Sequence, residues 1–319
     1  MQLSPRIWGL LDDKAGHANQ VRGLIEALSI PTQTISLTYN RWAALPNALL
    51  GATMCHLRGD TRAELKEQIA QNIPTLVIAC GRRTEPVARY IKRMHPNTRM
   101  VYIMRPANMK GWDAMIIPAH DKPPKNDPRI IASLMPLHRV NDAAIAQAKM
   151  RYEQLFAHLP HPRIGVLIGD IKDIAPCVTA MEKIAGQEGS LLITTSRRTA
   201  PHIAQMLRDK ITFPHHFYDA HAQVDADNPY MGILAYADVL IVSGDSLSMC
   251  AEAVATGKPV YIDDSDNGLS KKHRAMHRAL YEKGCAKPLS QALQQEIFLN
   301  EPSREIEKIA AQLRARFLS

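Results

Sequence analysis

The sequence has few aromatic residues, and its cysteines follow no recognisable spacing. Only 5% of the 319 residues are Phe, Trp or Tyr whereas 46% are hydrophobic, so buried cores must be mainly aliphatic. No CxxC pair occurs, which argues against a zinc site and a disulfide framework and favours a reducing, cytoplasmic setting. The cysteines are Cys55, Cys80, Cys177, Cys250 and Cys285.

The sequence also lacks a run of about 18 apolar residues, and it does not begin with a basic stretch followed by an apolar one. We therefore expect a chain that is soluble, or at most peripheral at the inner face of a membrane. The formal charge of +8 would suit an anionic ligand, a nucleic acid or an acidic membrane surface. Charge alone does not choose among these partners.

Length and proline distribution predict two domains. A chain of 319 residues exceeds the ~100–200 residues of a typical domain. Prolines crowd residues 118–136, a helix-patterned stretch follows at 141–158, and prolines at 160 and 162 precede a new strand. We predict an N-terminal domain over 1–138, a linker helix over 139–160 and a C-terminal domain over 161–290. In the remaining segment, 291–319, we expect a helix at 303–317 that packs back across the domains.

The two halves open alike, with the strands IWGLL at 7–11 and IGVLI at 164–168. Each half also has a strand that runs into an Arg-Arg-Thr turn and a helix. Two guanidiniums beside a helix N-terminus make a strong site for phosphate or carboxylate. Alternatively, the two arginines of a turn diverge and one is a solvated surface charge. The threonines are expected to cap the helices that follow; the turns are Arg82-Arg83-Thr84 and Arg197-Arg198-Thr199.

Residues 230–262 read as helix, strand, glycine turn, helix and strand. The β-branched run at 239–242 predicts a strand buried on both faces of a parallel sheet. The turn leads into a helix capped by Asp245 or Ser246, which ends at a Thr-Gly pair. Its first turn would present backbone N–H groups to an anion, with the hydroxyls of Ser246 and Ser248 as further donors. Alternatively, this is an ordinary βαβ unit whose serines only cap a helix.

Carboxylates, a lysine, an imidazole and amides crowd residues 12–20, between the first strand and the next helix. The glycine in this segment allows the backbone to approach a ligand closely. We interpret His17 as a general base, with Asp12 or Asp13 either orienting it or serving as the base itself. Alternatively, His17 only hydrogen-bonds a substrate, and Asn19 only caps the helix.

A resemblance to a known family rests on three blocks: WGLLDDKAGHANQVRGLIEAL at 8–28, TTSRRT at 194–199 and ADVLIVSGDSLSMCAEAVATGKPVYI at 237–262. In order and spacing they resemble the family named for a plant mitochondrial fission factor, which also has bacterial members. The match covers most of the chain. Members of that family tend to show Gly-Gly after the strand that opens the second half. This chain has Gly169-Asp170 there, an acidic turn that would repel a phosphate.

The layout more distantly resembles the GT-B glycosyltransferases. That resemblance implies an α/β fold with two Rossmann-like domains facing a cleft, the C-terminal one holding the nucleotide diphosphate and the N-terminal one presenting the acceptor. It also implies that Glu252 meets the ribose. The residues expected to bind the donor are Thr195, Ser196, Arg197, Arg198, Thr199, Gly244, Asp245, Ser246, Leu247, Ser248, Met249 and Glu252. Those expected on the acceptor side are Lys14, Gly16, Asn19, Gln20, Arg82 and Arg83, and the catalytic residues are His17, Asp13 and Asp12.

The resemblance implies a metal-independent glycosyltransferase that moves a sugar from a nucleotide-sugar donor to a cell-envelope or lipid-linked acceptor. The nucleotide-sugar would be a co-substrate, and no cofactor or metal is expected. Arg197, Arg198 and the helix near Ser246 would stabilise the departing diphosphate. The alternative is a noncatalytic adaptor that kept the fold for partner or membrane binding.

Two charged runs receive simpler interpretations. The acidic run at 263–266 follows a strand as a short turn, and no second carboxylate or histidine cluster has ligand spacing, so we do not read it as a metal site. The basic run at 271–278 has no interleaved aromatics. We expect it to be the solvated face of a helix, or a patch that contacts anionic membrane lipid, and we expect no nucleic-acid partner.

Overall fold

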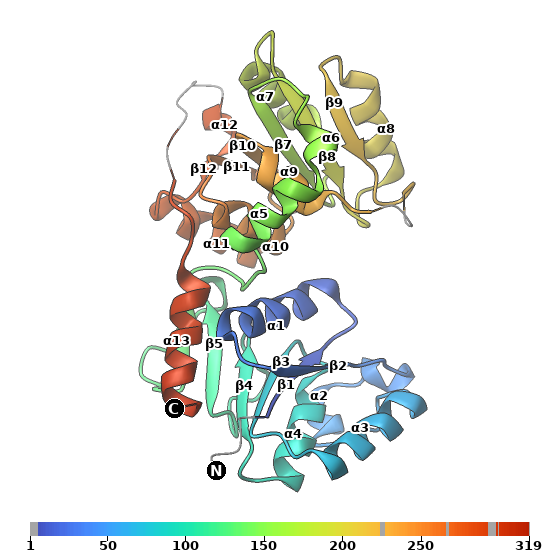
Figure 1. Cartoon of the computed structure of the whole chain (residues 1–319), viewed down its shortest axis with the longest axis vertical. Coiled ribbons are helices and arrows are strands. Elements are labelled where there is room, and N and C mark those ends of the chain that lie inside the picture. The colour runs from blue at the N-terminus through green and yellow to red at the C-terminus, as the bar shows by residue number, and fades with distance from the viewer. Residues whose placement is uncertain (1–5, 224–226, 266–267, 293–297, 299, 319) are drawn as a thin grey trace. The chain divides into compact units, whose positions relative to one another are not determined.

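The computed structural model describes residues 6–223, 227–265, 268–292, 298 and 300–318. The chain forms two compact units, called unit 1 and unit 2 below. Unit 1 comprises Met1–Arg139 and Glu305–Ser319, and unit 2 comprises Val140–Arg304. Within the described residues each unit has one parallel sheet of six strands with helices on its faces (Figure 1).

Unit 1 alternates strands with helices, as the apolar runs and their punctuating turns predict. Its elements are β1 (Ile7–Leu11), α1 (Ala15–Leu28), β2 (Thr32–Ser36), the 3-10 helix η1 (Arg41–Ala44), α2 (Asn47–Leu50), α3 (Gly59–Gln71), β3 (Leu76–Cys80), α4 (Glu85–Met94), β4 (Arg99–Ile103), β5 (Ala114–Pro118), the 3-10 helix η2 (Ala119–Asp121), β6 (Ile130–Ser133) and α13 (Glu305–Phe317).

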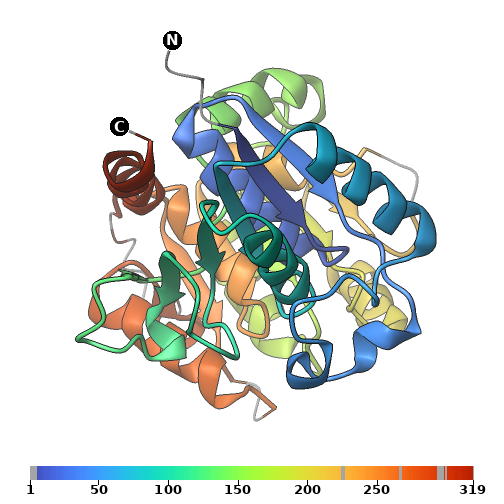
Figure 2. The ribbon, with the colours of Figure 1, turned by 90° about the horizontal axis from the view of Figure 1, so that it is seen from below.

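The sheet of unit 1 is covered on both faces, so its central strands are apolar along their whole length. Every residue of β1, β3 and β5 is buried. One face packs against α1 and α13, whose Ile306, Ile309 and Leu313 join that core. The other face packs against α3 and α4. The last helix, seen almost end-on in Figure 2, thus belongs to the core of unit 1. The sequence showed the apolar face of this helix, but it did not show which surface of the protein that face packs against.

Unit 2 begins with two short helices. Its elements are α5 (Asp142–Arg151), α6 (Glu153–Phe156), β7 (Arg163–Ile168), α7 (Ala175–Ala185), β8 (Ser190–Thr195), α8 (Pro201–Lys210), β9 (His215–Tyr218), α9 (Tyr230–Tyr236), β10 (Val239–Ser243), α10 (Leu247–Ala255), β11 (Val260–Asp263), α11 (Lys271–Glu282), β12 (Lys287–Pro288) and α12 (Leu289–Ala292).

The sequence suggested a separate linker helix over 139–160. The structure instead has two short helices there, α5 and α6, and from Val140 onward this segment is part of unit 2. The rings of Tyr152 and Phe156 lie 6.1 Å apart, centre to centre. Both rings press on Gly232 in α9, where a Cβ atom would lie 2.6 Å from the Tyr152 ring. The absence of a side chain at Gly232 therefore lets this segment dock on α9.

The strand orders identify two versions of the doubly wound fold. Unit 2 has the order β12-β11-β10-β7-β8-β9. When these strands are renumbered 1 to 6 along the chain and the sheet is read from the β9 edge, the order is 3-2-1-4-5-6. This is the order of dinucleotide-binding Rossmann domains. Unit 1 has the order β2-β1-β3-β4-β5-β6, the flavodoxin-like 2-1-3-4-5 order with one strand added. In such sheets ligands bind beyond the carboxyl ends of the strands, where the strand order reverses. That switch point lies between β1 and β3 in unit 1 and between β7 and β10 in unit 2.

No helix among the described residues combines the length and the apolar character that a membrane crossing requires. All five cysteines are free thiols.

Candidate functional site

The switch point of unit 1 holds an aspartate–histidine pair. Asp12 follows β1, and its Oδ2 atom lies 2.6 Å from Nδ1 of His17 in the first turn of α1. The Asp12 side chain is buried, whereas that of His17 is 23% exposed. Burial alone would raise the pKa of Asp12, but the hydrogen bond to His17 and the charge of Arg83 outweigh it and lower that pKa. Asp12 therefore stays ionised and orients the imidazole, while the other ring nitrogen remains available for chemistry.

Gly81, directly after β3, makes this pair sterically feasible. Its φ is +95°, and a Cβ atom there would lie 2.3 Å from Nδ1 of His17 and 2.8 Å from Oδ2 of Asp12. Only glycine combines that backbone conformation with that close approach. Gly81 was not predicted as a site residue, although a glycine at the end of a buried strand was a usable signal.

Arg83 forms ion pairs with both carboxylates that follow β1. Its guanidinium donates to Oδ1 of Asp12 at 2.8 Å and to both carboxylate oxygens of Asp13, one of them at 3.0 Å. It also lies over the ring of Tyr39, 4.4 Å from the centroid. Tyr39 in turn stacks on the ring of His56, whose Nε2 lies 2.8 Å from the carbonyl oxygen of Arg83. Tyr39 and His56 were missed by sequence reasoning because only the tertiary fold brings them here.

The remaining residues expected in unit 1 have varied positions. Arg82 diverges from Arg83 and donates to the carbonyls of Ala43 and Leu45, both at 2.6 Å. Helix α1 begins at Ala15, so Asn19 lies in its second turn and does not cap it. Lys14 is exposed and Gly16 and Asn19 are half-buried, while Gln20 is buried and its Oε1 has no hydrogen-bond partner among the described residues.

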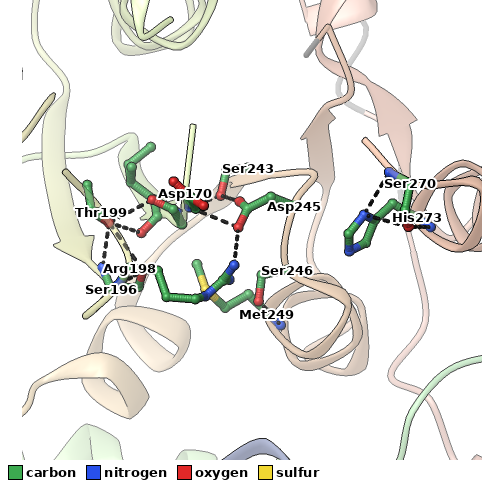
Figure 3. A network of polar contacts seen from close by, with 12 residues as sticks. Asp170, Ser196, Arg198, Thr199, Ser243, Asp245, Ser246, Met249, Ser270 and His273 are labelled. Carbon is green, nitrogen blue, oxygen red and sulfur yellow. Dashed lines mark hydrogen bonds and ion pairs between the residues drawn. The ribbon is translucent and has the colours of Figure 1, made fainter. Parts of the chain in front are cut away.

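At the switch point of unit 2, Asp245 joins the ends of three strands (Figure 3). Its carboxylate accepts hydrogen bonds from the hydroxyl of Ser243 and the backbone N–H of Asp170, each at 2.8 Å. It also pairs with Arg198 at 2.8 Å. Gly169 lets the carboxylate approach, since a Cβ atom there would lie 2.2 Å from Oδ1 of Asp245. A carboxylate thus occupies the crevice between β7 and β10, and an anionic ligand needs another place.

The second Arg-Arg-Thr turn is fixed by Thr199, which is buried. Its hydroxyl lies 3.0 and 2.7 Å from the carbonyl oxygens of Ile168 and Gly169, and it accepts the N–H of Ser196 at 2.9 Å. The expectation that Thr199 caps α8 was wrong, because Ala200 is the N-cap residue of that helix. Thr84 has the N-cap position of α4, but its hydroxyl donates to the Gly81 carbonyl and caps no N–H.

The helix after β10 begins as the sequence predicted. Ser246 is its N-cap, and the Ser246 hydroxyl accepts the N–H of Met249 at 3.4 Å. Leu247 and Ser248 form the first turn and are half-buried. The helix ends before Gly257, whose φ is +75°.

A cavity of about 540 Å³ opens beside this helix, on the β8 side. Arg197 lines it, is exposed, and has no hydrogen-bond or ion-pair partner within the described part of the chain. The two arginines of the turn therefore diverge, Arg198 toward Asp245 and Arg197 toward the cavity. The other residues that line it are Thr194, Thr195, Ser196, Tyr218, Ala220, His221, Asn228, Tyr230 and Met249.

Glu252 lies next to this cavity and is bonded to one of its lining residues. The hydroxyl of Tyr230 donates to Oε2 of Glu252 at 2.5 Å. Burial raises the pKa of Tyr230, and the charge of Glu252 raises it further, so the phenol stays protonated. Tyr218, His221, Asn228 and Tyr230 were not predicted, although the polar and aromatic run after the strand at 215–218 was a signal.

The two charged runs follow one another in the chain, and the structure describes the acidic run in part and the basic run in full. Asp263 accepts two hydrogen bonds from Ser265, and Asp266 lies outside the described residues. Within the described ranges no three His, Cys, Asp or Glu side chains are grouped so as to hold a metal ion. The basic run forms the start of α11, with Lys271, Lys272, Arg274 and Arg278 exposed and Met276 and His277 buried, which confirms a helix with one solvated face.

The chain was compared with protein families and with curated proteins. The family model described as Mitochondrial fission ELM1 matches residues 15–317. An uncharacterized protein of Rickettsia prowazekii is 29% identical over 343 aligned positions, covering 95% of this chain and 96% of that protein. The mitochondrial fission protein ELM1 of Arabidopsis thaliana is also 29% identical, over 67% of this chain and 57% of its own length. The chain therefore spans a little more than half of the plant protein.

Solved structures show the fold. The UDP-GlcNAc 2-epimerase of Neisseria meningitidis, crystallised with UDP-GlcNAc, has a TM-score of 0.52 at 10% identity, covering 98% of this chain and 100% of that one. A glycosyltransferase from Rickettsia africae has a TM-score of 0.51 at 11% identity, covering 99% of each chain. These similarities confirm the predicted α/β fold with two Rossmann-like domains of the GT-B type. Identities this low carry the fold and not the activity.

Proposed function

The chain belongs to the mitochondrial fission ELM1 family, and we propose that it is a glycosyltransferase that uses a nucleotide-sugar. Unit 2 would bind the nucleotide diphosphate of the donor, and unit 1 would supply the base that activates the acceptor hydroxyl. The epimerase of Neisseria meningitidis was crystallised with UDP-GlcNAc, which makes UDP the first diphosphate to test.

The observation that carries the proposal is the cavity of about 540 Å³ at the carboxyl edge of the unit 2 sheet. Its volume is typical of small-ligand sites, and it combines aromatic rings, polar side chains and the guanidinium of Arg197. The exposed Arg197 has no partner among the described residues, so it can pair with a phosphate without breaking an existing contact. Asp245 already occupies the neighbouring crevice, which favours the Arg197 side for the diphosphate.

The transfer step would proceed as follows. The acceptor oxygen attacks the anomeric carbon, and the bond from that carbon to the diphosphate oxygen breaks, with its electron pair leaving on the diphosphate. Nε2 of His17 takes the acceptor proton, while the ionised Asp12 holds Nδ1 and stabilises the imidazolium. Arg197 and the N–H groups at the start of α10 would neutralise the charge that develops on the diphosphate, without requiring a metal ion.

For the acceptor we propose a hydroxyl of a lipid-linked or cell-envelope molecule, which would bring the protein to an anionic membrane surface. The exposed lysines and arginines at the start of α11 supply positive charge for such a contact. Cosedimentation with vesicles that contain or lack anionic lipid, repeated at high salt, measures this contact directly.

The decisive experiment is calorimetric titration of the full chain with UDP, GDP, CDP, ADP and dTDP. We expect one diphosphate to bind and Arg197→Ala to weaken it about tenfold or more, because a charged hydrogen bond is lost. Arg278→Ala is the matched control, since Arg278 is exposed on α11 and does not line the cavity. A diphosphate that binds Arg197→Ala as tightly as wild type would place the site elsewhere. If none of the five binds, the transferase proposal fails and the noncatalytic adaptor remains.

A second experiment addresses the chemistry. With the nucleotide identified, turnover of its sugar derivative is measured in wild type and in His17→Gln. We expect His17→Gln to lower kcat by about 100-fold or more while nucleotide affinity stays unchanged. Equal turnover in both proteins would remove His17 from the mechanism.

A further inference from the structure

A second cavity, of about 380 Å³, lies at the other edge of the unit 2 sheet, where the strands begin. Asp238 directly precedes β10, Arg163 begins β7, and Lys258 lies two residues before β11. These strands are parallel, so their first residues share one edge. The cavity is lined by Lys149, His161, Arg163, Tyr236, Asp238 and Lys258, among others. None of these residues has a role in the proposed transfer.

Lys258 is half-buried and lies against the last turn of α9. Its ammonium group donates to the carbonyls of Leu234 and Ala235, each at 2.7 Å. An ammonium has three N–H donors, so one remains beyond these two bonds. Burial and, less strongly, the charge of Lys149 lower the pKa of Lys258 to about 7, although the charge of Asp238 opposes them. Two lysines therefore repel one another across this cavity.

The carboxylate beside these cations is already engaged. Oδ2 of Asp238 lies 2.6 Å from Nδ1 of His161 and accepts the backbone N–H of Arg163 at 2.7 Å. Arg163 itself is buried, and its guanidinium donates to the carbonyls of Leu159 and Ala157. Lys149 is exposed, and its ammonium has no partner in the part of the chain that the structure describes. Positive charge around the cavity thus exceeds negative charge.

We propose that this cavity binds a dianionic phosphate group, of the kind that a small phosphate monoester carries, between Lys149 and Lys258. A dianion placed there would replace the repulsion of the two lysines with two attractions, and lysine is a common point-charge ligand for phosphate. The volume of about 380 Å³ leaves room for a small organic group on the phosphate. The proposal does not depend on the transferase function, because the two cavities share no lining residue.

Binding of this dianion is coupled to protons. A phosphate beside Lys258 favours its charged form, so at pH 8 the complex takes up a proton that the free protein lacks. Affinity should therefore fall as pH rises above about 7, by at most about tenfold per pH unit. The other charged groups that line the cavity are Lys149, His161, Arg163 and Asp238.

The test is calorimetric titration of the full chain with inorganic phosphate, glycerol phosphate and acetate at pH 8, in two buffers with different heats of ionisation. We expect both phosphates, but not monoanionic acetate, to bind with uptake of up to one proton. Lys149→Gln should weaken binding about tenfold. Lys210→Gln is the matched control, because Lys210 is exposed on α8 and does not line the cavity. Comparing the two phosphates distinguishes a site for the free ion from one for a monoester.

The site of any binding is assigned with Arg197→Ala, which alters the other cavity. Phosphate that binds Arg197→Ala normally and Lys149→Gln weakly supports the proposal, whether or not any nucleoside diphosphate binds the protein. Binding that Arg197→Ala abolishes and Lys149→Gln leaves intact overturns it, as does the absence of phosphate binding to wild type. Lys149 is exposed, so Lys149→Gln is expected to fold, and circular dichroism checks this.

Discussion

Both units place the second arginine of an Arg-Arg-Thr turn against an aspartate at the switch point, yet the two pairs differ in their surroundings. In unit 1 the Arg83 side chain is 18% exposed and its partner Asp12 is buried. In unit 2 the Arg198 side chain is 52% exposed and Asp245 is 10% exposed. The carboxylate in unit 1 also orients His17, whereas the one in unit 2 ties backbone and a serine hydroxyl together.

The comparison shows that one motif has different neighbours in the two units. In unit 1 the aspartate faces an imidazole with a free ring nitrogen, an arrangement suited to proton transfer. In unit 2 the carboxylate fills the crevice, and Arg197, which has no partner among the described residues, lines the adjoining cavity. The first arginines of the two turns also differ. Arg82 donates to backbone carbonyls, whereas Arg197 lines the cavity.

The largest difference is expected from removing the second arginine in each unit. Arg83→Met keeps the apolar stem but leaves Asp12 buried without its cation, so we expect a loss of about 3–5 kcal/mol of unfolding free energy. Arg198→Met should lose less than about 1 kcal/mol, because Arg198 is 52% exposed and Asp245 keeps its hydrogen bonds from Ser243 and the Asp170 N–H. All three tryptophans lie in unit 1, so fluorescence follows its urea unfolding and circular dichroism follows the whole chain. Equal losses would show that burial does not separate the two pairs.

The second-largest effect on unfolding free energy is expected from replacing the glycine beside each aspartate. Gly81→Ala both forces a side chain onto a positive φ and collides with the Asp12–His17 pair, so we expect a loss of about 2–4 kcal/mol. Gly169→Ala collides with Asp245 without a positive φ and should lose about 1 kcal/mol less. Gly111→Ala is the control for conformation, because its φ is +81° and its nearest neighbour is an ordinary contact at 3.5 Å. If Gly111→Ala matches Gly81→Ala in urea unfolding, the collision is unimportant.

A smaller difference between the units is expected when the threonine of each Arg-Arg-Thr turn is replaced by valine. Thr199→Val leaves the N–H of Ser196 without its acceptor and removes the hydrogen bonds to the end of β7. We therefore expect a loss of about 2 kcal/mol of unfolding free energy. Thr84→Val loses a single hydrogen bond, to the Gly81 carbonyl, and should lose about 1 kcal/mol. Both are measured by urea unfolding. A larger loss for Thr84→Val would mean that the threonine stabilises its turn more in unit 1 than in unit 2.

The smallest effects concern pH, and in both units stability rises with pH, although over different pH ranges. The folded pKa of Asp12 is lowered from 3.8, so its stabilisation is present above pH 4 and is lost as pH falls through the folded value. The pKa of Lys258 falls to about 7 from 10.5, so the unfolded chain binds more protons between these values and stability rises with pH there. The slope is at most about 1.4 kcal/mol per pH unit.

Asp12→Asn and Lys258→Met check these signs. Asp12→Asn should reduce the loss of stability toward pH 3, as measured by urea unfolding of unit 1 through tryptophan fluorescence. Lys258→Met should remove part of the rise between pH 7 and 9.5. Circular dichroism of the whole chain measures this rise, and tryptophan fluorescence identifies the part of the transition that belongs to unit 1. A rise that is unchanged in Lys258→Met would mean that Lys258 keeps an ordinary pKa.

Much of the fold was readable from the sequence because the pattern is local. The strand at 7–11 was placed to the residue. The helix between β10 and β11 was predicted with its glycine end and with a cap at Asp245 or Ser246, and the structure has Ser246 as the cap. A strand buried on both faces is apolar throughout, and caps need particular side chains, so each element carries its own signal. Those signals also placed both Arg-Arg-Thr turns at strand ends.

The sequence by itself determined the helices and strands, the family resemblance, and most of the polar residues at the carboxyl ends of the strands in both units. Only the tertiary structure decided which of them meet: Arg83 with Asp12, Arg198 with Asp245, Tyr230 with Glu252, and α13 with unit 1. A side chain's partner depends on strand order and on where neighbouring backbones come close. Strand order is set by burial summed over the whole sheet, and no local pattern in the sequence encodes that sum.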